Sequence, residues 1–404
     1  MLFGRSRLSF LFFAAALALA TPSLQAQTPG IPLADPTPVV SQLCGKPIAL
    51  LGESPVHGFA KTLEFKVELV RQLVDRCHYN AVFFESGLYD FLNLEEQARS
   101  GHPVTDPGVA AAIGGLWANR EVQPLIPFLR EKVNNGTLTL GGIDDQLGRG
   151  TWAQHEMPAA LTASLPDDEK NRCLAVLQKY MLWQYPPGAP YGPKDKAGIL
   201  SCLDTIHARL APSDPDAPAR ADDLAMIASL KRRFHRDFED SPPGIDSDTF
   251  WTNQRDLSMF RNFRWLLAQL PAHSKVIVWT ATVHAAKELS SVPGDANRVP
   301  LGLYIHREFG SRAFVLGFSA DSGSYAFTGQ PVRQLSPAPP DSLEARSFAG
   351  RDAGAVYFSP AALREIGPIS ARPLGITFVR ARWNQVLDGL IIFREEHAPQ
   401  DLRH

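Results

Sequence analysis

The sequence lacks the features that mark several large classes of protein. Lysine and arginine total 40 against 42 acidic residues, and a net charge of −2 gives no sign of the basic face that nucleic acid requires. No repeat period is visible, which argues against solenoids and propellers. Only four cysteines occur in 404 residues and none has C-x-x-C spacing, so a zinc site of cysteine ligands is not expected. We therefore expect a small-molecule substrate and no nucleic-acid partner.

Familiar catalytic signatures are also missing. There is no G-x-S-x-G nucleophile elbow, no H-E-x-x-H zinc helix, no Walker loop and no dinucleotide-type glycine fingerprint. These absences weigh against serine, zinc-helix and nucleotide chemistry, and we expect neither a cofactor nor a bound metal. A free imidazole has a pKa of about 6.5, which suits proton transfer at neutral pH. Water activated directly by a histidine remains as a hydrolytic chemistry.

The first residues have the pattern of a secretory signal peptide. Two arginines precede a short apolar run, Leu8 to Ala20, and residues 24–26 provide a small-residue exit. The run is too short to span a bilayer comfortably. We expect residues 1–26 to be removed on export to the periplasm or the medium, which would leave no stable membrane anchor.

Export would also place the cysteines in an oxidising compartment. Their even number permits disulfides there, and their order in the chain suggests the pairs Cys44–Cys77 and Cys173–Cys202.

Strand and helix signals alternate along the rest of the chain. After a Pro-rich leader over residues 27–40, buried strands are expected at 48–52, 81–84, 137–140, 276–279, 314–318 and 389–393. Helical spacing between them predicts an α/β fold with a mostly parallel sheet flanked by helices. From about residue 152 to 245, helices separated by prolines predict a helical insertion or cap within one catalytic domain over residues 41–404.

Ionisable residues follow the predicted strands. Glu53 and His57 come directly after the first strand, Glu85 ends the second, Asp144 follows the third, and His284 follows the strand at 276–279. Ligands of open parallel sheets bind at the carboxyl ends of the strands. We therefore expect these side chains to form one functional site.

A helix predicted over residues 249–267 carries further polar side chains. Arg255, Met259 and Asn262 share one face because they are spaced i, i+4 and i+7. A buried arginine needs partners, and the strand-end carboxylates would supply them. We expect Arg255, Asn262, Glu85 and Asp144 to bind substrate or to stabilise an oxyanion.

Several motifs, in this order, resemble the erythromycin esterase family. The likeness covers roughly residues 47–393 and rests on Leu51-Gly-Glu-Ser-Pro-Val-His-Gly, Ala81-Val-Phe-Phe-Glu85, Trp117-x-x-x-Glu121-Val, Gly142-Ile-Asp144, Arg255-Asp256-x-x-Met259-x-x-Asn262 and Val276-Ile-Val-Trp279-x-x-x-x-His284.

The resemblance implies metal-independent ester or lactone hydrolysis without a covalent intermediate. His57 would act as general base on water, Glu53 would orient it, and His284 would line the same site. Lys66 and Arg255 would bind substrate or stabilise the oxyanion. The family pattern has one residue fewer between the glutamate and histidine of this loop, so the resemblance implies the hydrolytic scaffold rather than a macrolide substrate.

Two other functions fit the same residues. A divalent metal on His57, His284 and either Glu85 or Asp144 would give a metal-dependent hydrolase, because these ligand types suit zinc or manganese. A non-catalytic protein that binds haem or another small ligand is the second alternative.

Overall fold

The computed structural model describes residues 28–211 and 218–402, so the expected signal peptide lies outside the described residues. Within them the chain forms a nine-stranded sheet in the order β1-β8-β11-β6-β2-β5-β3-β4, with β7 paired to β6. The strands are β1 (Ile31–Pro32), β2 (Ile48–Leu51), β3 (Ala81–Gly87), β4 (Thr139–Asp144), β5 (Val276–Trp279), β6 (Ala313–Tyr325), β7 (Arg333–Gln334), β8 (Ala355–Phe358) and β11 (Gly389–Glu396). A separate antiparallel pair is formed by β9 (Ile369–Ala371) and β10 (Val379–Ala381).

Most of the large sheet is parallel, as the alternation of strands and helices predicts. The pairs β11–β6, β6–β2, β2–β5, β5–β3 and β3–β4 are all parallel. The pairs β1–β8, β8–β11 and β6–β7 are antiparallel. The predicted fold class, a mostly parallel α/β sheet flanked by helices, is confirmed.

The central strands are buried on both faces, because helices cover each side of the sheet. Successive residues of β2 illustrate this: Leu50 belongs to one apolar core and Leu51 to the other, and both are fully buried. One core packs against α11 (Ser247–Gln269), α13 (Leu301–Phe309) and the helical insertion. The other packs against α1 (Thr37–Cys44), α2 (Ala60–Cys77) and α5 (Leu125–Asn134).

The remaining helices are short or belong to the helical insertion. They are α3 (Leu88–Arg99), α4 (Asp106–Ile113), α6 (Trp152–His155), α7 (Met157–Thr162), α8 (Asp167–Met181), α9 (Pro193–Leu210), α10 (Pro218–His235), α12 (Thr282–Ala285), α14 (Leu343–Phe348), α15 (Pro360–Ile366) and α16 (Trp383–Val386). No helix of the described residues is long and apolar enough to cross a membrane.

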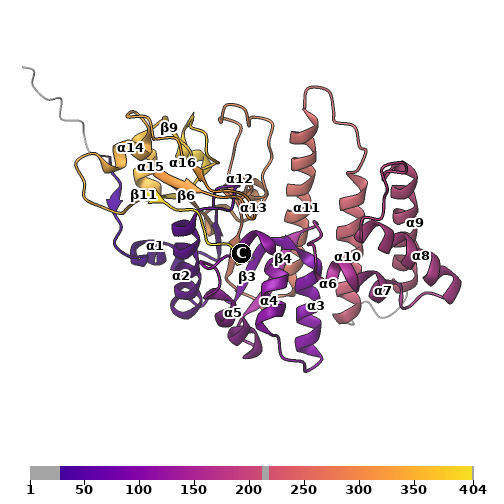
Figure 1. The fold of residues 1–404 in the computed structure, drawn as a ribbon. Coiled ribbons are helices and arrows are strands. Elements are labelled where there is room, and N and C mark those ends of the chain that lie inside the picture. Colours follow the sequence, from indigo (N-terminus) through magenta and orange to yellow (C-terminus); the bar gives the residue numbers. More distant parts are fainter. Residues whose placement is uncertain (1–27, 212–217, 403–404) are drawn as a thin grey trace, which may run out of the picture.

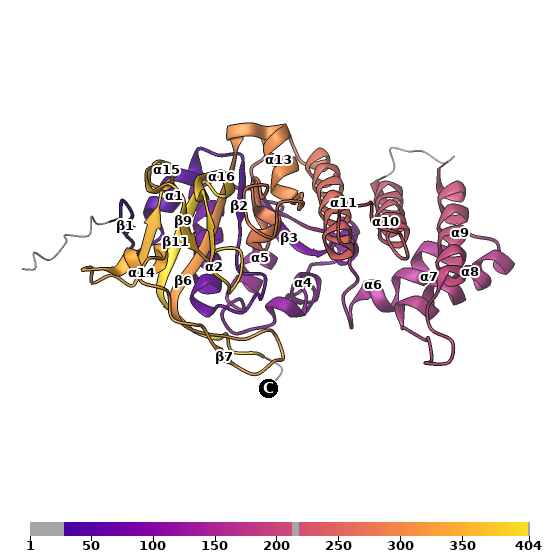
Figure 2. The same cartoon turned by 90° about the horizontal axis from the view of Figure 1, so that it is seen from above.

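The helices α6–α10 fill the region in which the sequence predicts an insertion. They lie beside α11, at the end of the molecule farthest from α14 and β1 (Figures 1 and 2). The leader segment contributes β1, which pairs with β8, and the start of α1.

Both predicted cysteine pairings are confirmed. Cys44–Cys77 joins the ends of α1 and α2 with a Cα–Cα distance of 4.9 Å. Cys173–Cys202 joins α8 to α9 within the insertion, at 5.4 Å. The described residues contain no free cysteine.

Candidate active site

The sheet order brings the predicted strand-end residues to one edge. Strands β2, β5, β3 and β4 are consecutive neighbours and parallel, so their carboxyl ends lie side by side. Glu53 follows β2, Glu85 lies near the end of β3, Asp144 ends β4, and His284 lies in α12, directly after β5. Each of these four side chains is buried.

The first part of the site is a histidine–glutamate pair in the loop after β2. The backbone of His57 is strained, because its φ of 50° is uncommon for a residue other than glycine. Its backbone N–H donates to Ser54 O in a turn that contains Pro55, and this turn returns the ring to the preceding glutamate. The His57 Nδ1 to Glu53 Oε1 distance is 2.7 Å. The extra residue of this loop is therefore taken up by a turn.

The other oxygen of Glu53 is held by Lys66 from α2. Lys66 Nζ donates to Glu53 Oε2 at 2.7 Å and lies 4.1 Å from the ring centroid of Trp279. Burial raises the pKa of Glu53, but Lys66 and His57 outweigh burial and hold that pKa below its usual value. Burial lowers the pKa of Lys66 to about 8, against the opposing charge of Glu53. The fully buried ammonium group thus faces Glu53 rather than the cleft.

Trp117 completes this part, although the sequence predicts no role for it. Its indole Nε1 donates to Glu53 Oε1 at 2.7 Å, the same oxygen that bonds His57. The two rings meet edge to face, with centroids 5.3 Å apart. Trp117 is 64 residues from Glu53 in the chain, so no local spacing could have indicated the contact. The tryptophan belongs to a family motif noted above, and that is the only signal the sequence offers.

Arg255 is the centre of the second part of the site. Its Nε donates to Asp144 Oδ2 at 3.1 Å, and its Nη2 donates to Glu85 Oε1 at 2.9 Å. The sequence predicts these carboxylate partners. Glu85 also accepts from Thr280 Oγ1 and from Ala281 N, at 2.7 and 2.8 Å.

The donors and positive charges around Glu85 lower the pKa of its carboxyl group. Burial raises it, but the charges of His284 and Arg255 and the backbone N–H of Ala281 lower it well below the usual value. Glu85 is therefore ionised at neutral pH.

His284 is fixed by a carboxylate that the sequence does not single out. His284 Nδ1 lies 2.9 Å from Asp256 Oδ1, and that oxygen also accepts from Leu301 N. His284 Nε2 lies 3.0 Å from Arg255 Nη1 and 3.3 Å from Glu85 Oε1. Burial lowers the pKa of His284, but Asp256 and Glu85 outweigh it and raise that pKa above its usual value. The charged form of this ring is therefore favoured relative to that of a free imidazole.

Asn262 lies apart from this network. Its side chain donates to Ile143 O at 2.9 Å and to Ser229 Oγ at 3.2 Å, and it accepts from Arg232 of α10. It joins α11 to the β4 strand and to the insertion, one residue behind Asp144. The other seven predicted residues all take part in the two halves of the site: Glu53, His57, Lys66, Glu85, Asp144, Arg255 and His284.

The segment after β5 connects the two halves. Thr282 N donates to Glu53 O at 2.6 Å, while the two residues before it bond Glu85. Gly52 permits this approach, since a Cβ there would lie 2.7 Å from Thr282 Oγ1. The charge of His57 also acts on Glu85, which places the two halves within electrostatic reach of each other.

The residues proposed for a metal site do not converge as ligands. Within residues 28–211 and 218–402, no group of three histidine, cysteine or acidic side chains could hold a metal ion. The guanidinium of Arg255 lies between Glu85, Asp144 and His284 and bonds both carboxylates. The positive charge of Arg255 therefore already occupies the position between these side chains that a metal ion would need.

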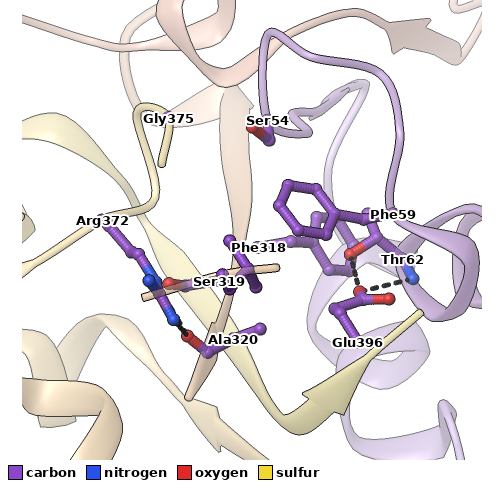
Figure 3. A pocket seen from close by; sticks show the side chains of 10 residues that line it. Ser54, Phe59, Thr62, Phe318, Ser319, Ala320, Arg372, Gly375 and Glu396 are labelled. Carbon is purple, nitrogen blue, oxygen red and sulfur yellow. Dashed lines mark hydrogen bonds between the residues drawn. The ribbon is translucent and has the colours of Figure 1, made fainter. Parts of the chain in front are cut away.

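Two hollows of very different size adjoin the site. Behind the Glu53–His57 loop, Ser54, Thr62, Arg372 and Glu396 line a cavity of about 10 Å³, which is room for about one water molecule (Figure 3). In front of the strand ends a cleft of about 500 Å³ opens. It is lined by Glu85, Asp144 and the loops of residues 110–116 and 146–151. Of these two hollows, only the cleft at Glu85 and Asp144 is large enough for a substrate.

The chain is thus an α/β protein with buried histidine–carboxylate pairs at the carboxyl edge of a mostly parallel sheet. The chain belongs to the erythromycin esterase family, whose model matches residues 74–396. The matched region contains Glu85, Asp144, Arg255 and His284 and begins after the Glu53–His57 loop. The family that the sequence motifs indicate is thus confirmed.

Known proteins resemble the chain over most of its length. A Bacillus subtilis protein named "Putative hydrolase YbfO" is 24% identical over 338 residues, covering 75% of this chain and 72% of that protein. A succinoglycan biosynthesis protein has a similar structure, with a TM-score of 0.68 at 13% identity over 94% of this chain and 97% of that one. The structure of a mutant of the erythromycin esterase EreC, in its open conformation, is also similar. Its TM-score is 0.63 at 16% sequence identity, and the match covers 90% of this chain and 94% of that one. At such identities the structures show a shared fold, while family membership supports a hydrolase.

Proposed function

We propose that this protein is an exported hydrolase that cleaves an ester or a lactone with water activated by His57. The observation that carries the proposal is the 2.7 Å contact between His57 Nδ1 and Glu53 Oε1. A carboxylate at Nδ1 favours the tautomer with the proton on Nδ1, which leaves the lone pair of Nε2 to act as a base. No hydrogen bond to His57 Nε2 is formed within the described residues.

The reaction then needs no covalent intermediate. His57 Nε2 takes a proton from water while the water oxygen bonds to the carbonyl carbon, and the carbonyl electron pair moves to its oxygen. Collapse of this tetrahedral species breaks the bond to the leaving oxygen. That oxygen takes a proton from His284, whose charged form Asp256 and Glu85 favour by raising its pKa. Arg255 supplies positive charge for the oxyanion, and such a donor is worth roughly 3–4 kcal/mol of transition-state stabilisation.

The roles of the remaining residues follow from their contacts. Lys66 and Trp117 keep Glu53 ionised and oriented, since both donate to its oxygens. Glu85 and Asp144 line the cleft and hold Arg255 directly beside them, where we expect it to reach the oxyanion. The metal-dependent alternative is less well supported, because Arg255 already bonds the carboxylates that the metal would require.

Two features support export. The sequence begins with a signal-peptide pattern, and the two disulfides are typical of proteins that fold in an oxidising compartment. Expression of the full chain followed by fractionation tests this: we expect mature protein that lacks residues 1–26 outside the cytoplasm. Full-length chain retained in the cytoplasm would contradict export.

The hydrolytic proposal is tested with His57→Asn and a matched control. His78 is also a histidine at positive φ, 60°, but it is exposed at the end of α2. Asparagine tolerates this backbone conformation, so neither His57→Asn nor His78→Asn should unfold the protein. On a panel of aryl esters and lactones we expect His57→Asn to lose about 10²–10⁴-fold in kcat/KM.

The control variant His78→Asn should keep wild-type rates. Equal activity of wild type and His57→Asn would refute the proposed base. Metal analysis of the active enzyme accompanies the assay, and a stoichiometric metal whose removal abolishes turnover would support the metal-dependent alternative instead.

A further inference from the structure

A third hollow, separate from the two described above, lies between the carboxyl edge of the sheet and the helical insertion. It has a volume of about 260 Å³ and is lined by residues 146–149 together with Gln154, Tyr180, Met181, Trp183 and Arg233. The same loop, residues 146–149, also lines the large cleft at Glu85 and Asp144, so the two hollows share a wall. Small-molecule pockets span roughly 300–1,000 Å³, and this cavity therefore has room for one ring-sized unit. We call it the Trp183 pocket.

Trp183 is held in this cavity by an unfavourable backbone. Its φ is 49°, and its side chain is 60% exposed. Positive φ at a bulky residue costs on the order of 1–3 kcal/mol, and strain of this kind gathers at ligand-binding sites. Phe238 repeats the combination, with a φ of 59° and 56% exposure. Core packing explains neither residue, because both rings face solvent.

The aromatic residues around Trp183 form a connected cluster. Tyr191 lies between the two exposed rings, with centroids 5.9 Å from Trp183 and 5.3 Å from Phe238. Tyr191 donates its hydroxyl to Asp237 at 2.9 Å, and Arg233 bonds the same carboxylate. Arg233 also donates to Tyr180 Oη, at 3.2 Å. The wall of the pocket is therefore fixed before any ligand binds, which reduces the entropic cost of binding.

We propose that the Trp183 pocket binds a saccharide ring. The apolar C–H face of a sugar packs against an exposed aromatic ring, and its hydroxyl groups need polar partners at the edge of that ring. Arg149 and Arg233 supply N–H donors beside Trp183. The neighbouring rings meet at steep angles, 74° for Tyr180–Trp183 and 66° for Tyr180–Tyr191, so these pairs offer no parallel gap for a flat aromatic ligand. An aliphatic chain would place no acceptors beside the two arginines of the pocket.

The position of the pocket connects it with catalysis. A saccharide bound at Trp183 would lie on one side of the loop at 146–149, and the acyl or lactone carbon would lie on the other, near Arg255. This connection rests on the proposed function, whereas saccharide binding itself does not.

Binding is measured on the full mature chain by saturation-transfer NMR. The probes are methyl glycosides of glucose, galactose, mannose and rhamnose, with phenol as the flat aromatic probe. We expect transfer to at least one glycoside, concentrated on the C–H groups of one ring face. Trp183→Gly removes the ring and relieves the positive φ, so the variant should fold as well as wild type while its affinity falls about tenfold or more.

The control is Leu182→Ala, the preceding residue, which is 40% exposed and does not line the pocket. It should bind the glycoside like wild type, and so should His57→Asn. The proposal is overturned if no glycoside binds wild type, if only phenol binds, or if Trp183→Gly binds as well as Leu182→Ala. Since no turnover is measured, a failure of the hydrolytic proposal would leave this result unaffected.

Discussion

Replacing Trp117 with phenylalanine tests whether the indole N–H supports the catalytic pair. In the wild-type protein Trp117 Nε1 donates to the buried Glu53 at 2.7 Å. A hydrogen bond to a charged group contributes about 1.5–3 kcal/mol. Lys66 and His57 still hold Glu53 in the variant, so we take the lower figure. About 1.5 kcal/mol corresponds to a roughly tenfold loss in kcat/KM.

The variant should also change the pH profile. Removing a donor from Glu53 disfavours its charged form, so the pKa of Glu53 rises relative to wild type. A protonated Glu53 no longer supports His57 as a base. The acid limb of kcat/KM should therefore move to higher pH, and the loss of activity should be greatest on the acid side.

Trp279→Phe is the matched control. Trp279 is also buried, and it contacts the same group of residues, but its Nε1 has no hydrogen-bond partner within the described residues. Phenylalanine keeps an aromatic ring beneath Lys66, so we expect a change of less than about threefold. Equal losses in both variants would show that packing accounts for the effect. An unchanged pH profile in Trp117→Phe would refute the role of the N–H.

Two further variants probe titrating groups. Asp256→Asn removes the charge that most raises the pKa of His284. The alkaline limb of kcat/KM should therefore move to lower pH, and kcat should fall about 10²-fold on the alkaline side. An alkaline limb that does not move would exclude His284 as the acid. Burial raises the pKa of Glu344 to about 7, so its stabilising contribution is full below about pH 4.5 and is lost as the pH rises to about 7, at a cost of about 3 kcal/mol. Glu344→Gln should therefore raise Tm at alkaline but not at acid pH, as calorimetry can show, and an equal shift at both pH values would contradict this account.

The sheet and most of the site could be predicted because their signals are local. Short apolar runs predict the buried strands, and the residue after each run must lie at the carboxyl edge. The expected strand at 137–140 illustrates the limit, since it forms as β4, two residues later and longer. Helix α5 likewise begins only at Leu125, after Pro124. Asn119 accepts from Val122 N and ends the preceding turn.

The contacts that orient the catalytic groups could not be predicted. Trp117 reaches Glu53 across 64 residues, and its partner is set by how the loop after α4 packs on β2. Lys66 illustrates the same limit in another way. The sequence shows that Lys66 follows Glu53 closely in the chain. It does not show whether the ammonium group faces the cleft or the carboxylate, because that depends on its burial against the ring of Trp279. Side-chain direction is a tertiary property, and spacing in the chain does not determine it.

The balance of charge explains why a histidine occupies the position of His284. The network contains four carboxylates, those of Glu53, Glu85, Asp144 and Asp256, and two basic side chains, Lys66 and Arg255. Buried charges are tolerated only when they are paired, so the site favours a further positive charge. Protonation of His284 supplies it, in agreement with the raised pKa. An arginine at this position would give the same balance of charge but could not release a proton. The histidine does both, because Glu85, which contacts its Nε2, also lines the cleft in which a leaving oxygen would need the proton.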